Sequence, residues 1–342
     1  MPQQVRFGVV GINHGHIYGM TDTLLRAGAQ LVSFFAPEPD LASQFARRYP
    51  QARAARDQAE VLEDTRIQVV ASAGIPDERG PLGINVMRHG KDFMSDKPAF
   101  TSLDVLRDAQ RVQRETGRIY AISYSERVQS PAMVKAGELV RAGAIGKPLQ
   151  TIGLGPHRLS ATSRPRWFFD RARYGGILVD IGAHQADHFL YFTESTSAQV
   201  VCSQVGNLAN PDEPGLEDFG DAVLRGDGGS GYFRVDWFTP DGLAAWGDGR
   251  LTVLGTDGVI EVRKNLDREG NPGSALFLAD RAGQRYVDYS DVDPPYGRQL
   301  LADIEQRTET AMPQAHAFLA AELTLQAELQ ATTITRRPQT VS

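Results

Sequence analysis

The first 125 residues alternate short apolar runs with segments of helical periodicity. Helical patterns cover residues 41–48 and 82–88, and a further helix leads through Leu24 to Arg26. Strands that alternate with helices in this way are typical of a parallel sheet covered on both faces. The pattern therefore predicts a doubly wound α/β domain. The apolar runs expected to form its strands are residues 5–10, 31–35, 68–71, 92–94 and 119–122.

Two helix boundaries in this region carry local signals. Gly28 is placed to end the first helix, because glycine adopts the left-handed conformation that follows many helices. Residues 101–104, Thr-Ser-Leu-Asp, have a capping-box pattern that predicts the start of a helix, and Gly117 would close it.

The pattern changes after residue 125. Ser130-Pro131 predicts a helix start, and strand-like runs at 222–224, 231–238, 250–254 and 259–262 follow, separated by turn signals. A last helix is expected over 313–330. We expect a mostly antiparallel sheet here, and hence two domains, 1–124 and 125–342.

Composition narrows the class of protein. A chain of 342 residues with net charge −6 and no basic run argues against a nucleic-acid partner. No apolar run reaches the ~18 residues that a membrane span needs, and no signal peptide is evident at the start. The lone cysteine, Cys202, excludes an internal disulfide and is expected in the core. We expect a cytoplasmic protein with a small-molecule substrate.

The first strand is followed by Gly11-Ile12-Asn13-His14-Gly15-His16. Dinucleotide-binding turns read Gly-x-Gly-x-x-Gly, so that the backbone and a helix N-terminus receive the pyrophosphate. Gly11 fits the first position, but asparagine and histidine replace the other two glycines. Asparagine tolerates a positive φ, and His14, Asn13 and the Gly15 amide could donate to phosphate. The alternative is a turn that binds nothing.

The position that reads the adenosine ribose lies about 20 residues past this turn. Here it holds Ala36, which cannot bind a hydroxyl, and Glu38 follows two residues later. No arginine stands there for a 2′-phosphate. NAD and NADP both stay open as cofactors, with a slight preference for NAD.

Asp96-Lys97-Pro98 follows a predicted strand at its carboxyl end, where open α/β sheets bind ligands. A lysine at that edge can donate to a substrate hydroxyl and favour its alkoxide. The alternative is a surface lysine before a turn proline.

Asp180, His184 and Asp187 recur at spacings of four and three in an apolar segment opened by Gly175-Gly176. On a helix these side chains share a face. A carboxylate beside an imidazole can orient the ring and tune its basicity for proton transfer. A buried polar pair that joins the helix to its neighbour is the other interpretation, and both stay open.

A metal stripe is an alternative for the same helix, because Asp180, His184 and His188 follow one another at i, i+4. Aspartate and histidine suit zinc or iron. No further ligand cluster is apparent, and Phe189-Leu190 indicates that His188 packs in the core. We therefore expect no metal.

Taken in order, these motifs resemble the glucose-fructose oxidoreductase / inositol dehydrogenase (Gfo/Idh/MocA) family. The glycine turn comes first, and Asp96-Lys97-Pro98 stands where the family has Glu-Lys-Pro. A Gly-Ala-Ile-Gly connector follows at 143–146, and a Gly-Thr-x-Gly turn at 255–258. Between them come the remaining motif residues, Trp167, Asp170, Gly175, Gly176, Asp180, Gly182, His184 and Asp187.

The resemblance implies an N-terminal Rossmann domain and a C-terminal α/β domain with a large open, mostly antiparallel sheet. That sheet often forms homo-oligomers, here a dimer or tetramer. It implies hydride transfer between NAD(P) and a sugar-, polyol- or cyclitol-like hydroxyl compound. Lys97 would polarise the substrate oxygen, His184 would be the general acid/base, and Asp180 would contact substrate and orient His184.

The residues and the resemblance together indicate a cofactor site and a substrate site. The cofactor residues would be Gly11, Ile12, Asn13, His14, Gly15, Glu38, Ser72, Ala73, Gly74, Asp96 and Glu126. Substrate contacts are expected from His157, Arg166 and Trp167; arginines around Trp167 could recognise an acidic group or simply be solvated. A catalytically idle, nucleotide-binding regulator and a metal-dependent isomerase or lyase are the alternative functions.

Overall fold

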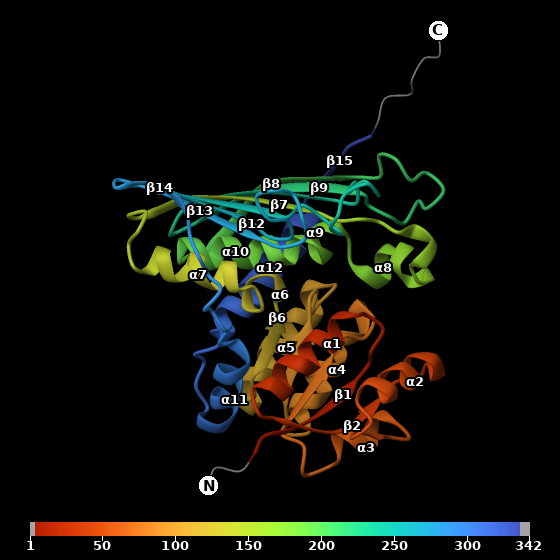
Figure 1. The fold of residues 1–342 in the computed structure, drawn as a ribbon. Helices are drawn as coiled ribbons and strands as arrows, with labels where there is room; N and C mark the ends of the chain where they lie inside the picture. Colours follow the sequence, from red (N-terminus) through yellow and green to blue (C-terminus); the bar gives the residue numbers. More distant parts are fainter. Residues whose placement is uncertain (1–3, 336–342) are drawn as a thin grey trace. The chain divides into compact units, whose positions relative to one another are not determined.

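Six parallel strands form the central sheet of the N-terminal unit in the computed structural model, which describes residues 4–335 (Figure 1). The strands are β1 (Arg6–Val10), β2 (Gln30–Phe35), β3 (Arg53–Ala54), β4 (Val69–Ser72), β5 (Asp92–Asp96) and β6 (Tyr120–Ser123). Their order, β3-β2-β1-β4-β5-β6, is that of the doubly wound dinucleotide-binding fold. The predicted fold class is confirmed. The order reverses between β1 and β4, which is where such sheets bind ligands.

Helices join these strands and supply the apolar covering of the sheet. They are α1 (His16–Arg26), α2 (Pro39–Arg48), α3 (Gln58–Leu62), α4 (Pro76–Arg88) and α5 (Leu103–Thr116). Gly28 has φ +101°, directly after the end of α1, as predicted. The start of α5 differs in detail from the predicted capping box: Ser102 is the N-cap and accepts from the Val105 N–H at 3.3 Å. Valine at that place cannot return the bond, so only half of the box exists.

A second stretch of chain, Pro294–Phe318, belongs to the same compact unit as the residues up to Tyr124. It contains α11 (Tyr296–Gln306) and the start of α12 (Gln314–Leu329). Arg307 makes a two-bond ion pair with Asp92, at 2.7 and 2.9 Å. The Gln314 side chain accepts the Tyr120 backbone N–H at 2.7 Å. These bonds connect the late segment to the first residues of β5 and β6.

The second unit, Ser125–Asp293 with the chain from Leu319 onward, is built on nine strands. They are β7 (Pro148–Pro156), β8 (Ala198–Gly206), β9 (Phe219–Gly226), β10 (Ser230–Asp236), β11 (Arg250–Gly255), β12 (Val259–Arg263), β13 (Ala275–Asp280), β14 (Gly283–Tyr286) and β15 (Thr332–Thr333). Their order is β14-β13-β12-β11-β7-β10-β9-β8-β15. Two neighbouring pairs, β7 with β10 and β8 with β15, are parallel and the others antiparallel. The expected large, mostly antiparallel sheet is therefore present.

Helices cover one face of this sheet and leave the other without a helix in the described part of the chain (Figure 1). The helices of this unit are α6 (Ser125–Val128), α7 (Pro131–Arg141), α8 (Arg171–Tyr174), α9 (Ile177–Asp180), α10 (Gly182–Thr193) and the rest of α12. Ile152 and Leu254 are 40% and 44% exposed on neighbouring strands. None of the described helices is long and apolar enough to cross a membrane.

Cys202 is exposed, so its expected place in the core is wrong. The pairing of β8 with β9 shifts by one residue between Val200 and Cys202. Such a shift breaks the alternation of buried and exposed positions, and Val201 and Cys202 are both exposed in succession. The sequence shows the apolar run but not the irregularity within it.

A buried pair of carboxylates makes the stability of the second unit sensitive to pH. Glu328 accepts hydrogen bonds from Arg171 at 2.6 Å and from the Leu178 N–H at 3.1 Å. Burial, together with the neighbouring Glu217, raises the pKa of Glu328 to about 8. A carboxyl group whose pKa is raised on folding stabilises the fold below its unfolded pKa, and that contribution is lost as pH rises through the folded value.

We therefore expect the free energy of unfolding to fall between about pH 5 and pH 9, because Glu328 must ionise beside Glu217. Glu328→Gln keeps the shape without the charge and should flatten this slope, which denaturant unfolding at several pH values measures. Glu305→Gln, at an exposed position on α11, is the matched control. An unchanged slope in Glu328→Gln would assign the pH dependence to other groups.

Candidate functional site

The turn after β1 is bonded to the end of β4. The Gly11 carbonyl accepts the Ala73 N–H at 3.1 Å, and the Ala73 carbonyl accepts the His14 N–H at 2.9 Å. Gly11 has φ +78°, and a Cβ there would lie 3.0 Å from the Cα of Gly74 and 3.2 Å from the Ser72 Oγ. Glycine is therefore required at Gly11 for both conformation and space. The structure brings together Gly11–Gly15 and Ser72–Gly74, as the sequence predicted.

A cavity of about 510 Å³ opens beside this turn, and Gly11, Gly74, Phe35 and Pro37 are among the residues that line it. It lies at the carboxyl edge of β1, β2 and β4, the position at which doubly wound folds bind a nucleotide. Its volume is within the range of small-molecule sites. The site fits a dinucleotide despite the two missing glycines.

Asn13 and Glu38 lie together at this site. The Asn13 amide donates to Glu38 Oε1 at 2.7 Å. The other carboxylate oxygen, Oε2, is buried and accepts no hydrogen bond from the described residues. Asn13, which occupies the second glycine position of the motif, thus fixes the carboxylate of Glu38 after β2.

Asp96 and Lys97 end β5, and both are buried. The Asp96 Oδ1 accepts the Lys97 N–H at 2.8 Å, and the Lys97–Pro98 peptide is cis. Arg79, 1% exposed, donates to the carbonyls of Gly74 and Lys97 at 2.7 and 2.6 Å and approaches Asp96 Oδ2 at 3.2 Å. This buried arginine fixes the backbone that follows β4 and β5, including that of the predicted Lys97. The sequence analysis missed Arg79, because its partners lie 5 to 18 residues away and form no local motif with it.

The predicted Asp180, His184 and Asp187 stripe is divided between two helices. Asp180 ends α9, Ile181 follows in right-handed helical conformation, and α10 begins at Gly182. His184 is 2% exposed. Its backbone N–H donates to the carbonyl of Ile181, three residues earlier, at 3.2 Å. Asp187 forms a buried two-bond ion pair with Arg127 on α6, both bonds 2.7 Å long. Asp187 is thus held by an arginine of another helix.

A second buried ion pair lies close to His184. The Lys264 ammonium donates to the Glu126 carboxylate, and both side chains are at most 10% exposed. Burial opposes ionisation of Glu126, yet Lys264 and, more weakly, His184 and His188 hold its pKa well below the usual range. Glu126 was predicted beside the cofactor, and the structure places it on α6 with these groups. Lys264 was missed, because its partner is 138 residues away.

His188 is 1% exposed, and neither ring nitrogen has a hydrogen-bond partner among the described residues. Burial, with Lys264 adding to it, lowers the pKa of His188 to about 3. The ring is therefore neutral at pH 7. Its ring centroid lies 6.4 Å from that of His184, one turn away on α10.

The residues predicted to contact substrate differ in exposure. His157 follows β7 and packs edge-on against Trp237 and Trp246, with centroids 5.4 and 4.4 Å apart. Trp167 is partly buried. Arg166 is 81% exposed and paired with Glu213 at 2.8 Å. The structure thus supports the solvated alternative for Arg166.

Arg164 is the arginine of this group that turns inward. Its guanidinium lies 4.4 Å from the ring centroid of Phe168 and 5.1 Å from that of Trp237. Burial lowers the pKa of Arg164, and the carboxylate of Asp180 opposes that shift. A cation stacked on aromatic faces beside Asp180 belongs to the candidate substrate region.

Family models match both parts of the chain. The model of the oxidoreductase family with an NAD-binding Rossmann fold matches residues 5–124, and that of the GFO/IDH/MocA C-terminal domain matches residues 133–261. The chain belongs to the GFO/IDH/MocA oxidoreductase family. The order of motifs had indicated the same family.

Several relatives share this architecture. The crystal structure of a protein described as an oxidoreductase from Erwinia carotovora atroseptica SCRI1043 is 43% identical, with a TM-score of 0.94 over 97% of this chain and all of that one. The levoglucosan dehydrogenase of Pseudarthrobacter phenanthrenivorans is 24% identical over 87% of this chain and 83% of its own length. A levoglucosan dehydrogenase structure in complex with NADH has a TM-score of 0.78 at 17% identity, covering 96% of this chain and 98% of that one, and shows the shared fold.

Gly11→Ala tests the glycine turn of this family member. A side chain at φ +78° costs about 1–2 kcal/mol and must also push against Gly74. We expect NADH affinity to fall at least about tenfold, which corresponds to 1.4 kcal/mol, as measured by fluorescence titration. Gly28→Ala is the matched control, because Gly28 also has a positive φ but no atom within 4 Å of an added Cβ. Equal NADH affinity in both variants would contradict a close approach of cofactor to Gly11.

Proposed function

We propose that this protein is an NAD-dependent dehydrogenase that oxidises a hydroxyl group of a sugar, polyol or cyclitol, or reduces the corresponding ketone. The observation that carries the proposal is the buried Lys97 at the carboxyl end of β5 in the NAD-binding unit. The levoglucosan dehydrogenase relative acts, by its name, on a sugar derivative, and this likeness supports the substrate class. The order of family motifs in the sequence also assigns Asp180 and His184, which lie in the second unit, as the other catalytic residues.

Each polar group has a proposed task in this reaction. The Lys97 ammonium donates to the substrate oxygen and stabilises negative charge on it. His184, as a neutral imidazole, takes the hydroxyl proton in oxidation and returns it in reduction. Asp180 hydrogen-bonds substrate and orients His184. The nicotinamide, when bound, supplies the hydride acceptor or donor.

We propose that the turn at Gly11–Gly15, with Ser72–Gly74, holds the pyrophosphate, and that the cavity beside it holds the adenosine. Glu38 favours NAD over NADP. Its carboxylate would accept from ribose hydroxyls, whereas a 2′-phosphate would bring a second negative charge against this group, which Asn13 fixes in place.

The two units would then divide the work: the chain up to Tyr124, completed by Pro294–Phe318, would bind the cofactor, and the second unit would bind substrate and form the oligomer. The uncovered face of the nine-stranded sheet, with the exposed Ile152 and Leu254, supports association into a dimer or tetramer. A cytoplasmic location stays a prediction.

Titration with NADH and with NADPH, followed by nucleotide-reduction assays over a panel of sugars, polyols and cyclitols, tests this proposal. We expect NADH to bind at least about tenfold more tightly than NADPH, a difference of 1.4 kcal/mol. Glu38→Ala should narrow that difference, with Glu63→Ala as the control at the end of α3. If neither NADH nor NADPH binds at millimolar concentration, the proposal is overturned.

A further inference from the structure

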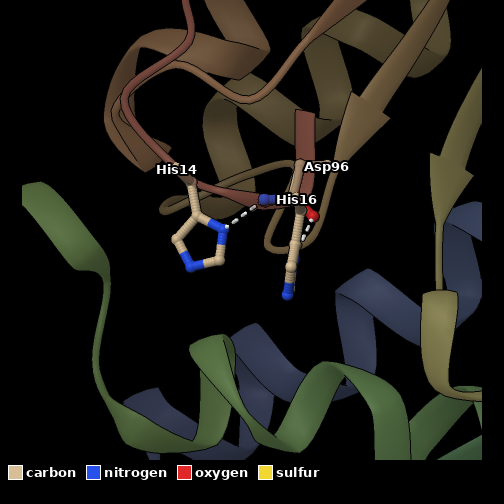
Figure 2. A group of neighbouring side chains, drawn as sticks. All are labelled: His14, His16 and Asp96. Atoms are coloured by element: carbon tan, nitrogen blue, oxygen red, sulfur yellow. Dashed lines mark hydrogen bonds and ion pairs between the residues drawn. The ribbon is translucent and has the colours of Figure 1, made fainter. Parts of the chain in front are cut away.

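Within the described range 4–335, one group of three side chains has the composition and spacing of a metal site: His14, His16 and Asp96. The two histidines come from the turn after β1 and the first residue of α1, and Asp96 ends β5 (Figure 2). One ligand atom from each lies within 4.8 Å of the others. All three belong to the first unit, so the group is complete within it.

The distances in this group suit a shared cation. Asp96 Oδ1 lies 2.9 Å from the Nδ1 of His16, and Oδ2 lies 3.4 Å from the Nδ1 of His14. Zinc bonds to nitrogen and oxygen are about 2.0–2.2 Å long, which places neighbouring ligand atoms roughly 3–3.5 Å apart. The ring nitrogens and carboxylate oxygens therefore need little movement to take one ion.

The 2.9 Å contact between the Nδ1 of His16 and Asp96 Oδ1 is a hydrogen bond, whose proton a metal ion would displace, while His14 keeps a ring nitrogen available. The His14 Nδ1 accepts a long bond, 3.3 Å, from the His16 N–H. An accepting Nδ1 carries a lone pair, so in the neutral ring the proton is on Nε2. That lone pair then faces the negatively charged Asp96 carboxylate, an arrangement that a cation between them would stabilise.

Asp96 supplies an independent observation. Its side chain is fully buried, yet Oδ2 accepts no hydrogen bond from the described residues. The Arg79 Nη2 forms an ion pair with that oxygen at 3.2 Å, while its Nη1 and Nε donate to backbone carbonyls. Buried carboxylate oxygens nearly always have a hydrogen-bond partner or a ligand. The position of Oδ2, beside His14, points to a ligand of this kind.

The ligand types narrow the choice of ion. Hard cations such as Mg²⁺ prefer oxygen ligands, whereas two of the three side chains here are imidazoles. Two imidazoles and one carboxylate match Zn²⁺ and Fe²⁺ and leave coordination positions open for water or another ligand.

We propose that His14, His16 and Asp96 bind one divalent transition-metal ion of the Zn²⁺ or Fe²⁺ class at the carboxyl edge of the parallel sheet. The site goes beyond the proposed dehydrogenase activity, which requires no metal. It also gives His16 a task at the position where dinucleotide-binding turns carry their third glycine. The stripe of Asp180, His184 and His188 that the sequence suggested is a different set of residues.

The test uses the full-length, untagged protein after treatment with a chelator. Calorimetric titration with Zn²⁺ and absorption spectroscopy with Co²⁺ as a probe should show one site per chain with nitrogen ligands. His14→Gln and His16→Gln should each weaken Zn²⁺ binding at least about tenfold, since loss of even an outer-sphere partner costs 10–100-fold. Both histidine side chains are partly exposed, 26% and 35%, so these variants should fold.

His89→Gln is the matched control, because His89 is exposed directly after the end of α4 and is not a member of the group. It should bind Zn²⁺ and Co²⁺ as the unaltered protein does. Absence of Zn²⁺ and Co²⁺ binding in the unaltered protein, or unchanged binding in both His14→Gln and His16→Gln, would overturn the proposal. Nitrogen hyperfine couplings from two imidazoles in the Co²⁺ form provide a readout that needs no variant. NADH titration of the same samples separates failure of this site from failure of the dehydrogenase proposal.

Discussion

Lys97→Met and His184→Gln are each expected to lower kcat by about 10²–10⁴-fold with a genuine substrate, the range that general acid–base catalysis contributes. The first removes the charge at the carboxyl end of β5 that would stabilise the substrate alkoxide. The second keeps a polar side chain of similar size but removes the basic nitrogen. If both groups act mainly in the transition state, kcat and kcat/KM should fall together. Steady-state kinetics measured by NADH absorbance gives both values.

Two surface substitutions control for nonspecific effects. Lys135→Met replaces a lysine that pairs with Glu138 on α7, and His89→Gln replaces an exposed histidine; both should leave kcat unchanged. Thermal unfolding of all four variants checks that the fold persists. Full activity of Lys97→Met or of His184→Gln would refute the proposed roles.

Arg127→Met and Asp187→Asn are each expected to destabilise the protein by about 3–5 kcal/mol, as breaking a buried ion pair usually does. The two side chains are 9% and 0% exposed and joined by two bonds. Either change leaves the other group buried and without its partner. Arg127 also lies 4.2 Å from the Tyr191 ring centroid, so its loss removes a stacking contact as well. Urea unfolding at pH 7 measures the change.

The double variant Arg127→Met/Asp187→Asn should lose less than the sum of the single changes, because it leaves no buried charge. Arg166→Met, which breaks the exposed pair with Glu213, should cost at most about 1 kcal/mol. Additive losses in the double variant would show that the two residues stabilise the fold independently.

The parallel sheet could be predicted because the buried strands of such a sheet are continuous apolar runs. The ends of α1 and α5 could also be predicted, because a glycine follows each helix in the sequence. The extent of α4 could not be predicted: the helix begins at Pro76, six residues before the predicted start at 82, and Pro81 lies inside it. The strands β13 and β14, at one side of the nine-stranded sheet, were also missed. The return of Pro294–Phe318 to the first unit depends on contacts between residues nearly 200 positions apart, and periodicity does not record these.

The candidate site divides in the same way. Gly11, Lys97, Asp180 and His184 stand in local motifs, and the sequence therefore finds them. The partners that hold the site together do not. Lys264 reaches Glu126, and Arg127 reaches Asp187, across 138 and 60 residues. A motif shows which residue types are near in sequence, whereas buried charges are paired by the fold.

The late segment that joins the first unit has a consequence for attempts to isolate the nucleotide-binding part. A fragment ending at Tyr124 would expose the Asp92 carboxylate that Arg307 neutralises and the Tyr120 N–H that Gln314 satisfies. It would also uncover the aromatic face of Phe100 and Tyr120 on which Phe318 packs. The nucleotide-binding half is thus completed by chain synthesised some 170 residues after its last strand, so it cannot finish folding while the ribosome is still making the sheet of the other half.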